Sequence, residues 1–291
     1  MRRACIDIGS NTTRLLVAES EPDRLRAVHQ DRAFTRIGRG IASDGMIDEA
    51  KIAEVVRVVS EQLELARDLG SNEVFGVATA AIRRARNGSA LVSAIETACG
   101  LRVQILSGEE EARLAFIGAA GTLGHRPVGA LGVVDVGGGS SEIVVGTAPH
   151  DVSWWVSCAI GSGDLAEEYL RSDPPLAEEL AAARARVAAA LAGVEVPPLL
   201  EAVAVGGSAT STGRLAGSLL DRAAFERSFS ALAAERAADV ARRFAIDLER
   251  VRLLPAGLLI LEAVSNLFGT PLQVGCGGIR EGVLLEAGEL V

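Results

Sequence analysis

The sequence predicts an α/β protein built from two related halves, and three observations support that prediction. The chain has 291 residues, a length that suits two domains better than one. Short apolar runs bounded by glycine alternate with longer amphipathic segments, which is typical of strands alternating with helices. A strand–turn–strand pattern of unusual composition also occurs twice, at residues 4–19 and at residues 130–147.

The second copy of this pattern reads A-L-G-V-V-D-V-G-G-G-S-S-E-I-V-V-G-T. An apolar run ends at Asp135, a small polar turn follows, and Glu142 begins another apolar run. The turn consists of Gly137, Gly138, Gly139, Ser140 and Ser141. Bare backbone N–H groups and serine hydroxyls can cradle phosphate oxygens, and a carboxylate at a strand end can hold a magnesium ion. A glycine-rich hairpin without a ligand is the alternative for this stretch alone.

The first copy aligns without gaps when Asp7 is placed over Asp135, at a separation of 128 residues. D-I-G-S-N-T-T-R-L-L-V then lies against D-V-G-G-G-S-S-E-I-V-V. The turn of this copy consists of Gly9, Ser10, Asn11 and Thr12. The repeat indicates two related halves whose phosphate-binding hairpins face each other across a cleft. Chance similarity of two hairpins is the alternative.

A glycine-rich loop after the first copy carries three arginines, namely Arg32, Arg36 and Arg39. This loop is either a solvated basic loop or a flexible wall that guides a long anion. Apolar residues at helical spacing then predict an amphipathic helix at 48–69. The apolar run that follows predicts a buried strand at 73–79.

Arg83 follows the end of that strand, in the stretch A-A-I-R-R-A-R. Arginines directly after a strand in an α/β layer point at the crevice where ligands bind. A guanidinium also meets phosphate bidentately, so Arg83 is the candidate phosphate clamp. A surface charge on a helix is the alternative for Arg83, and it is the favoured interpretation of Arg84 and Arg86.

A predicted strand at 101–106 leads into S-G-E-E-E-A-R-L at residues 107–114. Ser107 with Glu110 matches the capping box S-x-x-E, which gives acids in the first turn of a helix a structural explanation. Glu111 lies one position beyond that motif, where its side chain can project into a cleft and take a proton from water. Glu111 is therefore a candidate general base, with a structural role as the alternative.

The second half contains a third glycine-and-hydroxyl turn, from Gly206 to Ser211, after a predicted strand at 200–205. This turn enters a helix whose N-terminus favours anions. Thr210 stands where a nucleophile elbow G-x-S-x-G needs its last glycine, which disfavours a serine nucleophile. Further helices are predicted at 230–244 and 255–268.

Glycines near residue 121 predict a boundary between two domains, 1–121 and 122–291. A last helix begins at about residue 279, and packing of this helix back on the first domain is an option that the sequence leaves open.

Composition argues against several classes of protein. The net charge of −9 disfavours a nucleic-acid binder, which would show a basic surface. Lys51 is the only lysine and follows Ala50, so the chain has no Walker-type phosphate loop. The four cysteines are scattered and are expected to be buried free thiols, and the three histidines show no metal-ligand spacing. With no signal peptide or membrane-spanning run in view, we expect a soluble, cytoplasmic protein without nucleic-acid or membrane partners.

Six stretches, in this order, resemble the exopolyphosphatase/guanosine pentaphosphate phosphohydrolase family, which belongs to the superfamily of actin, hexokinase and the Hsp70 ATPase domain. They are D-I-G-S-N-T at 7–12, A-T-A-A-I-R at 78–83, S-G-E-E-E-A-R-L at 107–114, D-V-G-G-G-S-S-E at 135–142, G-G-S-A-T at 206–210 and G-G-I-R-E-G at 277–282. The resemblance covers essentially the whole chain and is closest to the short form of the family. It implies an α/β fold of two ribonuclease-H-like domains flanking a central cleft.

The resemblance also implies roles for individual residues. Glu111 matches the catalytic glutamate that activates water for in-line attack on a terminal phosphorus. Asp135 would hold Mg²⁺, or Mn²⁺ in its place, with Glu142 and Asp7 as helpers. Phosphates would be bound by Arg83, by the backbone of Gly9 to Thr12 and of Gly137 to Ser141, and by Gly207 and Ser208.

From this resemblance we expect a metal-dependent hydrolase that releases orthophosphate from the end of inorganic polyphosphate. Guanosine pentaphosphate is the alternative substrate, because both molecules end in a phosphoanhydride. Two alternatives belong to other classes: an ATP-binding kinase or ATPase, and a non-catalytic sensor of polyphosphate or nucleotide. A homodimer is an oligomeric state that the sequence leaves open.

Overall fold

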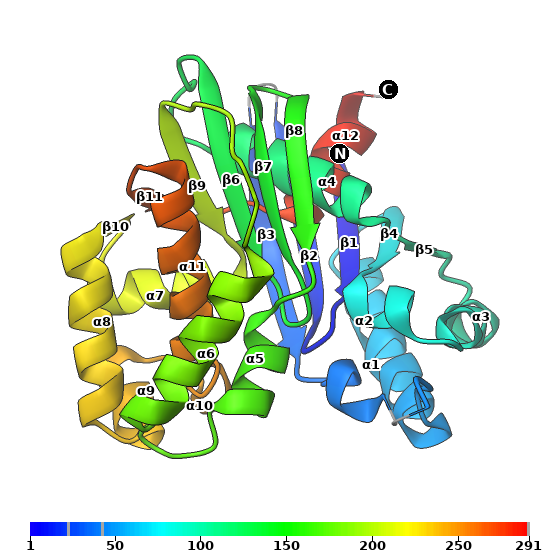
Figure 1. Cartoon of the computed structure of the whole chain (residues 1–291). Coiled ribbons are helices and arrows are strands. Elements are labelled where there is room, and N and C mark those ends of the chain that lie inside the picture. The colour runs from blue at the N-terminus through cyan, green and yellow to red at the C-terminus, as the bar shows by residue number, and fades with distance from the viewer. Residues whose placement is uncertain (22–23, 42–43, 290–291) are drawn as a thin grey trace. The chain divides into compact units, whose positions relative to one another are not determined.

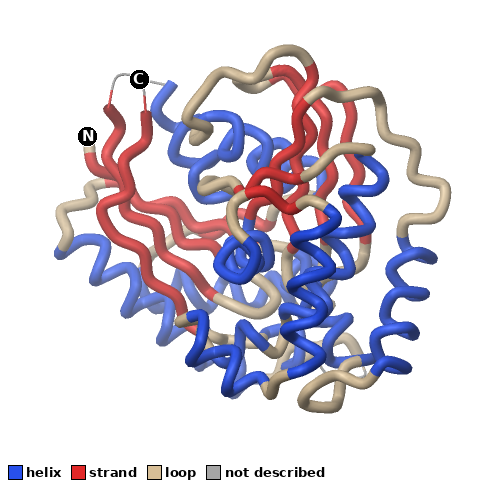
Figure 2. Tube along the Cα trace, turned by 90° about the vertical axis from the view of Figure 1, so that its left-hand side faces the viewer, coloured by secondary structure: helices blue, strands red, loops and turns tan. Residues whose placement is uncertain are grey.

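The computed structural model describes residues 1–21, 24–41 and 44–289 (Figure 1). The chain divides into two compact units. The first unit comprises Met1–Thr122 together with Gly277–Val291, and the second comprises Leu123–Cys276. Each unit is built on one β-sheet with helices packed against it (Figure 2).

The first sheet has five strands among the described residues, in the order β3-β2-β1-β4-β5. They are β1 (Arg2–Ile8), β2 (Thr13–Glu21), β3 (Arg24–Ala33), β4 (Glu73–Ala78) and β5 (Val103–Ile105). β1, β2 and β3 form an antiparallel meander, and β4 and β5 add in parallel on the other side of β1. The carboxyl ends of β1, β4 and β5 therefore share one edge, and the segments that carry the predicted site residues begin there.

The helices of the first unit are η1 (Ile37–Gly40), α1 (Glu49–Asp68), α2 (Ala80–Arg84), α3 (Gly88–Cys99), α4 (Gly108–Gly121) and α12 (Ile279–Glu289). Ala4, Ile6 and Ile8 of β1 pack into a core with side chains of α1 and α3. Cys5 packs into a second core with side chains of α4 and α12. Because side chains alternate along a strand, Asp7 faces the same side of the sheet as Cys5.

Helix α1 confirms the helix predicted at 48–69. Asp48 caps its N-terminus, where its side chain accepts a hydrogen bond from the backbone N–H of Lys51 at 2.6 Å. Val55, Val59 and Leu63 are buried at helical spacing, so the amphipathic pattern of the sequence marks the face that packs on the sheet.

The second sheet has six strands within the described ranges, in the order β10-β11-β9-β6-β7-β8. They are β6 (Ala130–Val136), β7 (Ser141–Thr147), β8 (Asp151–Cys158), β9 (Glu201–Val205), β10 (Leu219–Leu220) and β11 (Leu272–Val274). β6, β7 and β8 form an antiparallel meander, and β9 and β11 add in parallel beside β6. Without β10, this is the arrangement of the first sheet. The repeat in the sequence is therefore a repeat of the fold.

The repeated hairpins also agree in register. β1 and β6 show the same alternation of buried and half-buried positions, and Asp7 and Asp135 occupy the same half-buried position near their ends. Asp7 pairs with Arg14 across the first hairpin, as Asp135 pairs with Glu142 across the second. The alignment of Asp7 with Asp135 is thus confirmed, and chance similarity of the two stretches is excluded.

The helices of the second unit are α5 (Ser162–Tyr169), α6 (Ala177–Ala190), α7 (Gly206–Ala216), α8 (Arg222–Ala234), α9 (Ala237–Phe244), α10 (Leu248–Val251) and α11 (Leu254–Phe268). Two sequence expectations are wrong here. The helix predicted at 230–244 is split between α8 and α9, because the backbone is extended at Glu235 and Arg236. The sequence also predicts a turn after β9, but α7 begins directly at Gly206.

Helix α11 lies at the centre of the second unit (Figure 1). Most of its side chains are buried, and they contact β6, β9 and the helices α5, α6, α7 and α8. Its first two turns, Leu254–Leu261, are buried on all sides, so α11 lies in the core that supports β6 of the second hairpin.

Helix α12 packs against α4 of the first unit through glycines. A Cβ on Gly118 would lie 1.9 Å from the carbonyl oxygen of Gly278, and a Cβ on Gly282 would lie 2.1 Å from that of Leu114. Any larger residue at these positions would force the two helices apart. Close helix packing therefore explains the glycines of the stretch G-G-I-R-E-G.

All four cysteines are free thiols. Cys5 and Cys158 are buried and Cys99 is partly buried, but Cys276 is exposed, contrary to the expectation from the sequence. Cys276 lies in the irregular segment after β11, where its side chain is outside the sheet. Among the described helices, none has the length and apolar character needed to cross a membrane.

Candidate active site

The first hairpin closes with a tight turn between β1 and β2. The Gly9 N–H donates to the Thr12 carbonyl at 3.0 Å, and a Cβ on Gly9 would also lie 3.0 Å from that oxygen. Ser10 and Thr12 are buried, and Asn11 Nδ2 is a buried donor without a hydrogen-bond partner. An unpaired buried donor is costly unless an acceptor reaches it, and a phosphate oxygen is such an acceptor. The turn therefore fits the predicted anion cradle.

Asp7 lies near the end of β1, before this turn. Its Oδ1 atom is buried without a hydrogen-bond partner. Burial raises the pKa of the Asp7 carboxyl group, while Arg280 and Arg14 oppose that rise and Glu281 reinforces it. A buried carboxylate oxygen with unused lone pairs suits a cation. The geometry of Asp7 is thus compatible with its predicted role as a helper ligand.

The second hairpin repeats the turn of the first. The Gly137 N–H donates to the Ser140 carbonyl at 3.0 Å. The start of α5 braces this turn, because the Ser162 N–H donates to the Gly137 carbonyl at 2.9 Å. A Cβ on Gly161 would lie 2.3 Å from the carbonyl carbon of Gly138, so only glycine permits this contact. The peptide groups of the turn are consequently held in place by the fold itself.

Asp135 and Glu142 place two carboxylates on one face of the second sheet, because they are direct partners across β6 and β7. Glu142 is buried, and the Ser157 hydroxyl donates to its Oε1 at 2.8 Å. Burial raises the pKa of the Cys158 thiol, and the neighbouring Glu142 carboxylate raises it further. Two such carboxylates suit Mg²⁺, which takes its remaining oxygens from water and substrate phosphate.

No group of three or more His, Cys, Asp or Glu residues in the described part of the chain is arranged to hold a metal ion. A cation at Asp135 and Glu142 would therefore need oxygen ligands beyond these two side chains. Mg²⁺ commonly binds in this way, with one or two carboxylates completed by waters and phosphates.

Gly206 brings the start of α7 against Asp135. Its φ of 83° lies in the left-handed region, and a Cβ there would be 2.3 Å from Asp135 Oδ1. Gly207 and Ser208 follow in the first turn of α7, and Ser208 is buried. The unpaired N–H groups and the dipole of a helix N-terminus favour an anion. The predicted phosphate-binding pair is therefore next to the predicted metal ligand.

Arg250 also lies at this helix start, although the sequence did not single it out. It is only 7% exposed, and a Cβ on Gly207 would lie 2.6 Å from its guanidinium carbon. The Arg250 guanidinium adds N–H donors beside the helix N-terminus, which itself favours an anion. In the sequence Arg250 stands in D-L-E-R-V-R, which has the composition of a charged surface segment. Only the packing of α10 on α7 shows its position.

The first unit brings Arg83 and Glu111 into direct contact. Arg83 lies near the end of α2, and its Nη1 donates to Glu111 Oε1 and, at 2.6 Å, to the Leu106 carbonyl. The Glu111 side chain is 3% exposed, whereas 29% of the Arg83 side chain remains exposed. A guanidinium carries five N–H donors, so Arg83 can hold Glu111 and still reach a ligand. The predicted clamp therefore positions the predicted base.

The neighbouring acid, Glu110, has the structural role expected from the capping box. The Ser107 N–H donates to Glu110 Oε2 at 2.7 Å, and the Glu110 N–H donates to the Ser107 hydroxyl at 3.1 Å. These hydrogen bonds lower the pKa of Glu110. Arg84 and Arg86 are exposed, as expected for surface charges. Glu111 and Arg83 therefore have different environments from their sequence neighbours: Glu110 caps a helix, and Arg84 and Arg86 are exposed.

Each unit gathers its own set of predicted residues at the carboxyl edge of its sheet. In the first unit, Gly9 lies beside Thr79, since a Cβ on Gly9 would be 3.9 Å from Thr79 Oγ1. The Arg83 N–H donates to the Thr79 carbonyl at 3.0 Å, so the hairpin turn is adjacent to the Arg83–Glu111 pair. In the second unit, the hairpin turn, its two carboxylates and the start of α7 lie together.

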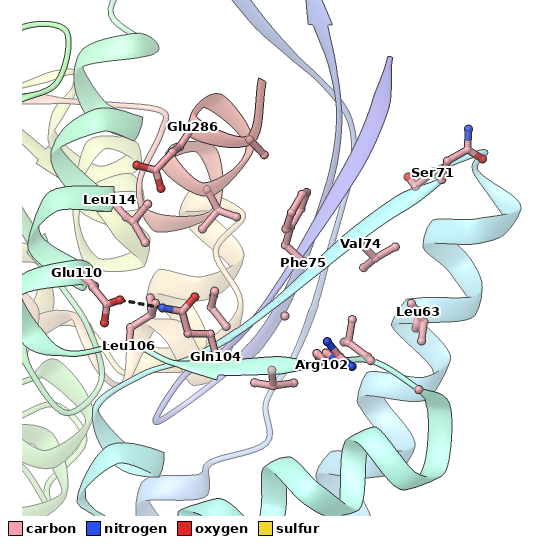
Figure 3. Close-up of a pocket in the computed structure, with 18 of the residues that line it drawn as sticks. Leu63, Ser71, Val74, Phe75, Arg102, Gln104, Leu106, Glu110, Leu114 and Glu286 are labelled. Atoms are coloured by element: carbon pink, nitrogen blue, oxygen red, sulfur yellow. Dashed lines mark hydrogen bonds between the residues drawn. The ribbon is translucent and has the colours of Figure 1, made fainter. Parts of the chain in front are cut away.

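A separate cavity of about 960 Å³ lies beside β5 of the first unit (Figure 3). Phe75, Leu114 and Glu286 are among its lining residues, and Gln104 donates to Glu110 at 2.7 Å within it (Figure 3). Its lining includes none of the predicted site residues. The predicted site residues of the first unit therefore lie outside this cavity.

Comparison with known proteins decides the family. The model of the Ppx/GppA phosphatase family matches residues 16–289. The chain belongs to the Ppx/GppA phosphatase family. Exopolyphosphatase 2 of Mycobacterium tuberculosis is 32% identical over 277 residues, which cover 92% of this chain and 80% of that protein. Exopolyphosphatase 1 of the same organism is 28% identical over 304 residues, covering 98% and 88%.

Solved structures of Ppx/GppA proteins have the same fold. The PPX-GPPA enzyme of Aquifex aeolicus is 30% identical, with a TM-score of 0.80 over 98% of this chain and 99% of that one. An exopolyphosphatase from Cytophaga hutchinsonii is 20% identical and shares the fold, with a TM-score of 0.86 over 100% and 99%. The two-domain α/β fold implied by the resemblance to this family is confirmed.

Proposed function

We propose that this Ppx/GppA family member is an exopolyphosphatase, which hydrolyses the terminal phosphoanhydride of inorganic polyphosphate and releases orthophosphate. The pairing of Arg83 with Glu111 is the observation that carries the assignment. It combines a buried carboxylate, suited to accept a proton, with a guanidinium suited to bind phosphate. Relatives named exopolyphosphatase, at 28% and 32% identity over most of the chain, support the choice of substrate.

Backbone and arginine donors would bind the phosphate oxygens. In the first unit these donors are the Gly9–Thr12 turn, with Asn11 Nδ2, and the exposed part of Arg83. In the second unit they are the Gly137–Ser141 turn and the start of α7. Oriented N–H groups stabilise phosphate charge well, because they need little reorganisation when the ligand binds.

Glu111 would act as the general base. It accepts a proton from a water molecule whose oxygen bonds to the terminal phosphorus while the bridging P–O bond breaks in line. The electron pair of the broken bond leaves with the shortened chain. Arg83 keeps the Glu111 carboxylate in position and donates to the phosphoryl oxygens. A positioned base typically contributes about 10²–10⁴-fold to the rate, and electrostatic stabilisation supplies a larger share.

A divalent cation, Mg²⁺ or Mn²⁺, belongs to the same proposal. Asp135 and Glu142 would hold it, because they pair two carboxylates on one face of the second sheet. Asp7 stays a predicted helper ligand, supported by its buried and unpaired Oδ1. When bound, the ion would neutralise phosphate charge and orient the phosphate oxygens.

Phosphate release from polyphosphate and from guanosine pentaphosphate, measured side by side, tests this function. We expect metal-dependent release from polyphosphate, and we expect Glu111→Gln to lower its rate by about 10²–10⁴-fold while polyphosphate binding persists. Phosphate release from guanosine pentaphosphate alone would show that this molecule, and not polyphosphate, is the substrate. Release from neither would contradict a hydrolase of terminal phosphoanhydrides.

A further inference from the structure

The described segment 34–41 follows β3, carries Arg36 and Arg39, and is fastened to the first unit at several points. Arg32, which the sequence places in the same loop, lies in β3. Thr35 is buried, and its hydroxyl lies 3.0 Å from the Thr13 hydroxyl. Lys51 donates from Nζ to the Thr35 carbonyl at 2.9 Å and to Glu54 at 2.6 Å. Lys51 also covers Gly40, where a Cβ would lie 2.9 Å from its Cγ. These anchors do not fit a flexible wall, whereas Arg32 and Arg39 are exposed, as a solvated loop would have them.

The same segment is docked on the Gly9–Thr12 turn. The Arg36 N–H donates to the Asn11 carbonyl at 3.0 Å, and the Gly38 N–H donates to the Ser10 carbonyl at 2.8 Å. Arg36 has a left-handed backbone, with φ 47° and ψ 46°, which is uncommon for a residue with a side chain. Such an outlier beside an anion cradle indicates a functional constraint on the direction of the Arg36 side chain.

Two guanidinium groups lie against the ring of Phe34, next to this turn. The guanidinium carbon of Arg32 lies 4.9 Å from the centre of the Phe34 ring, and that of Arg36 lies 5.9 Å from it. Arg32 is also the direct partner of Arg14 across β2 and β3. Three arginines therefore gather beside this turn, in a chain whose net charge is −9.

We propose that Arg32, Phe34 and Arg36 form a second subsite, which binds inner phosphates of a polyphosphate chain whose terminal phosphate lies at the Gly9–Thr12 turn. This subsite rests on the proposed function. The docked backbone joins it directly to the phosphate-binding turn, and the two arginines supply charge and donors for phosphate oxygens. A tripolyphosphate would fill the turn alone, whereas a long chain would also reach the subsite.

The same geometry predicts different binding of the two candidate substrates, polyphosphate and guanosine pentaphosphate, at this subsite. The Phe34 ring already carries two guanidiniums, so it offers phosphates a charged surface and does not offer a nucleobase a bare face on which to stack. The subsite therefore favours linear polyphosphate over guanosine pentaphosphate.

The double variant Arg32→Gln/Arg36→Gln tests the subsite, with tripolyphosphate and a long polyphosphate as substrates. We expect kcat/KM for the long chain to fall at least about tenfold more than for tripolyphosphate, mainly through KM, as the loss of a charge-assisted contact predicts. Arg32→Lys/Arg36→Lys keeps both charges and should recover part of the loss. High salt should narrow the preference of the wild type for the long chain, because salt screens exposed charges.

Arg57→Gln is the matched control, since Arg57 is an exposed arginine of α1 that pairs with Glu61. It should leave both substrates unaffected. Equal losses of the double variant on both substrates, or no loss on the long chain, would overturn the subsite while exopolyphosphatase activity stands. If the wild type hydrolyses neither substrate, the proposed function fails. The affinity of long polyphosphate then decides the subsite: weaker binding by the double variant supports it, and unchanged binding overturns it.

Discussion

Arg83 and Glu111 form an ion pair inside the first unit, with the arginine near the end of α2 and the glutamate in the first turn of α4. The Arg83 guanidinium donates hydrogen bonds to Glu111 and to the carbonyl of Leu106, the residue before the N-cap of α4. The glutamate is buried and the arginine remains partly exposed. A ligand that binds Arg83 is therefore brought close to Glu111, and this relationship underlies the first two predictions.

Replacing Glu111 with Gln should lower kcat for phosphate release by about 10²–10⁴-fold, because the amide cannot accept a proton from water. Binding of polyphosphate should change little, since glutamine keeps the size of the side chain and removes a negative charge. Turnover rates together with titration of polyphosphate binding measure both effects. Glu110→Gln is the matched control, and a similar loss of turnover in that variant would contradict the assignment of Glu111.

Replacing Arg83 with Lys should reduce kcat/KM by about 10–100-fold, although the charge is kept. A lysine ammonium cannot reproduce the planar guanidinium, which donates to Glu111 and to the Leu106 carbonyl and keeps further N–H donors for a phosphate oxygen. Steady-state kinetics of phosphate release measures the loss. Arg84→Lys, at the exposed neighbour, should be close to wild type. If both variants behave alike, Arg83 has no special part in binding.

Removing the predicted metal ligands should change the dependence on metal concentration. Asp135→Asn and Glu142→Gln each remove one anionic oxygen from the paired carboxylates, so we expect half-maximal activity at much higher Mg²⁺ concentrations. A chelator should abolish wild-type activity, and added Mg²⁺ or Mn²⁺ should restore it. Asp151→Asn, an exposed carboxylate of β8, is the control. An unchanged metal titration of both ligand variants would remove this site from the mechanism.

Gly206→Ala should impair both stability and activity. The left-handed backbone costs about 1–2 kcal/mol for a residue with a Cβ, and that Cβ would collide with Asp135 Oδ1 at 2.3 Å. Gly193 has a similar φ of 78° but nothing within 4 Å, so Gly193→Ala should show the backbone cost alone and keep activity. Thermal unfolding of the two variants measures the backbone strain that both share. Turnover measures the displacement of Asp135, which is expected only for Gly206→Ala. Equal activity in both would show that the collision is relieved without moving Asp135.

The capping box at α4 should make stability depend on pH. Hydrogen bonds from Ser107 lower the pKa of Glu110 in the folded state, so its contribution is present above the ordinary glutamate value of about 4.3 and is lost as pH falls through the lower folded value. Glu110→Gln keeps the side-chain oxygen of the capping box but removes its charge, so it should lower the Tm slightly near pH 7. The difference from wild type should shrink in acid. A gap in Tm that stays constant down to pH about 3 would contradict the capping role.

The sequence by itself determined the repeated hairpins and the capping box at the start of α4. A strand that ends in Asp7 or Asp135, followed by a small polar turn, is a local pattern, and local backbone freedom decides its shape. The alignment of the two copies consequently predicted equivalent hairpins with matching register. The capping box of Ser107 and Glu110 is local in the same sense, which is why it could be identified without a structure.

Only the tertiary structure decided which distant groups meet. Arg83 and Glu111 are 28 residues apart, and their contact depends on how α2 and α4 pack at the edge of the first sheet. Arg250 reaches Gly207 in the same way, from a segment that looks like surface in the sequence. Such contacts depend on the packing of separate elements, which periodicity and turn composition do not encode. The sequence therefore supplied the turns that can cradle phosphate, and the folded chain supplied the arginines beside them.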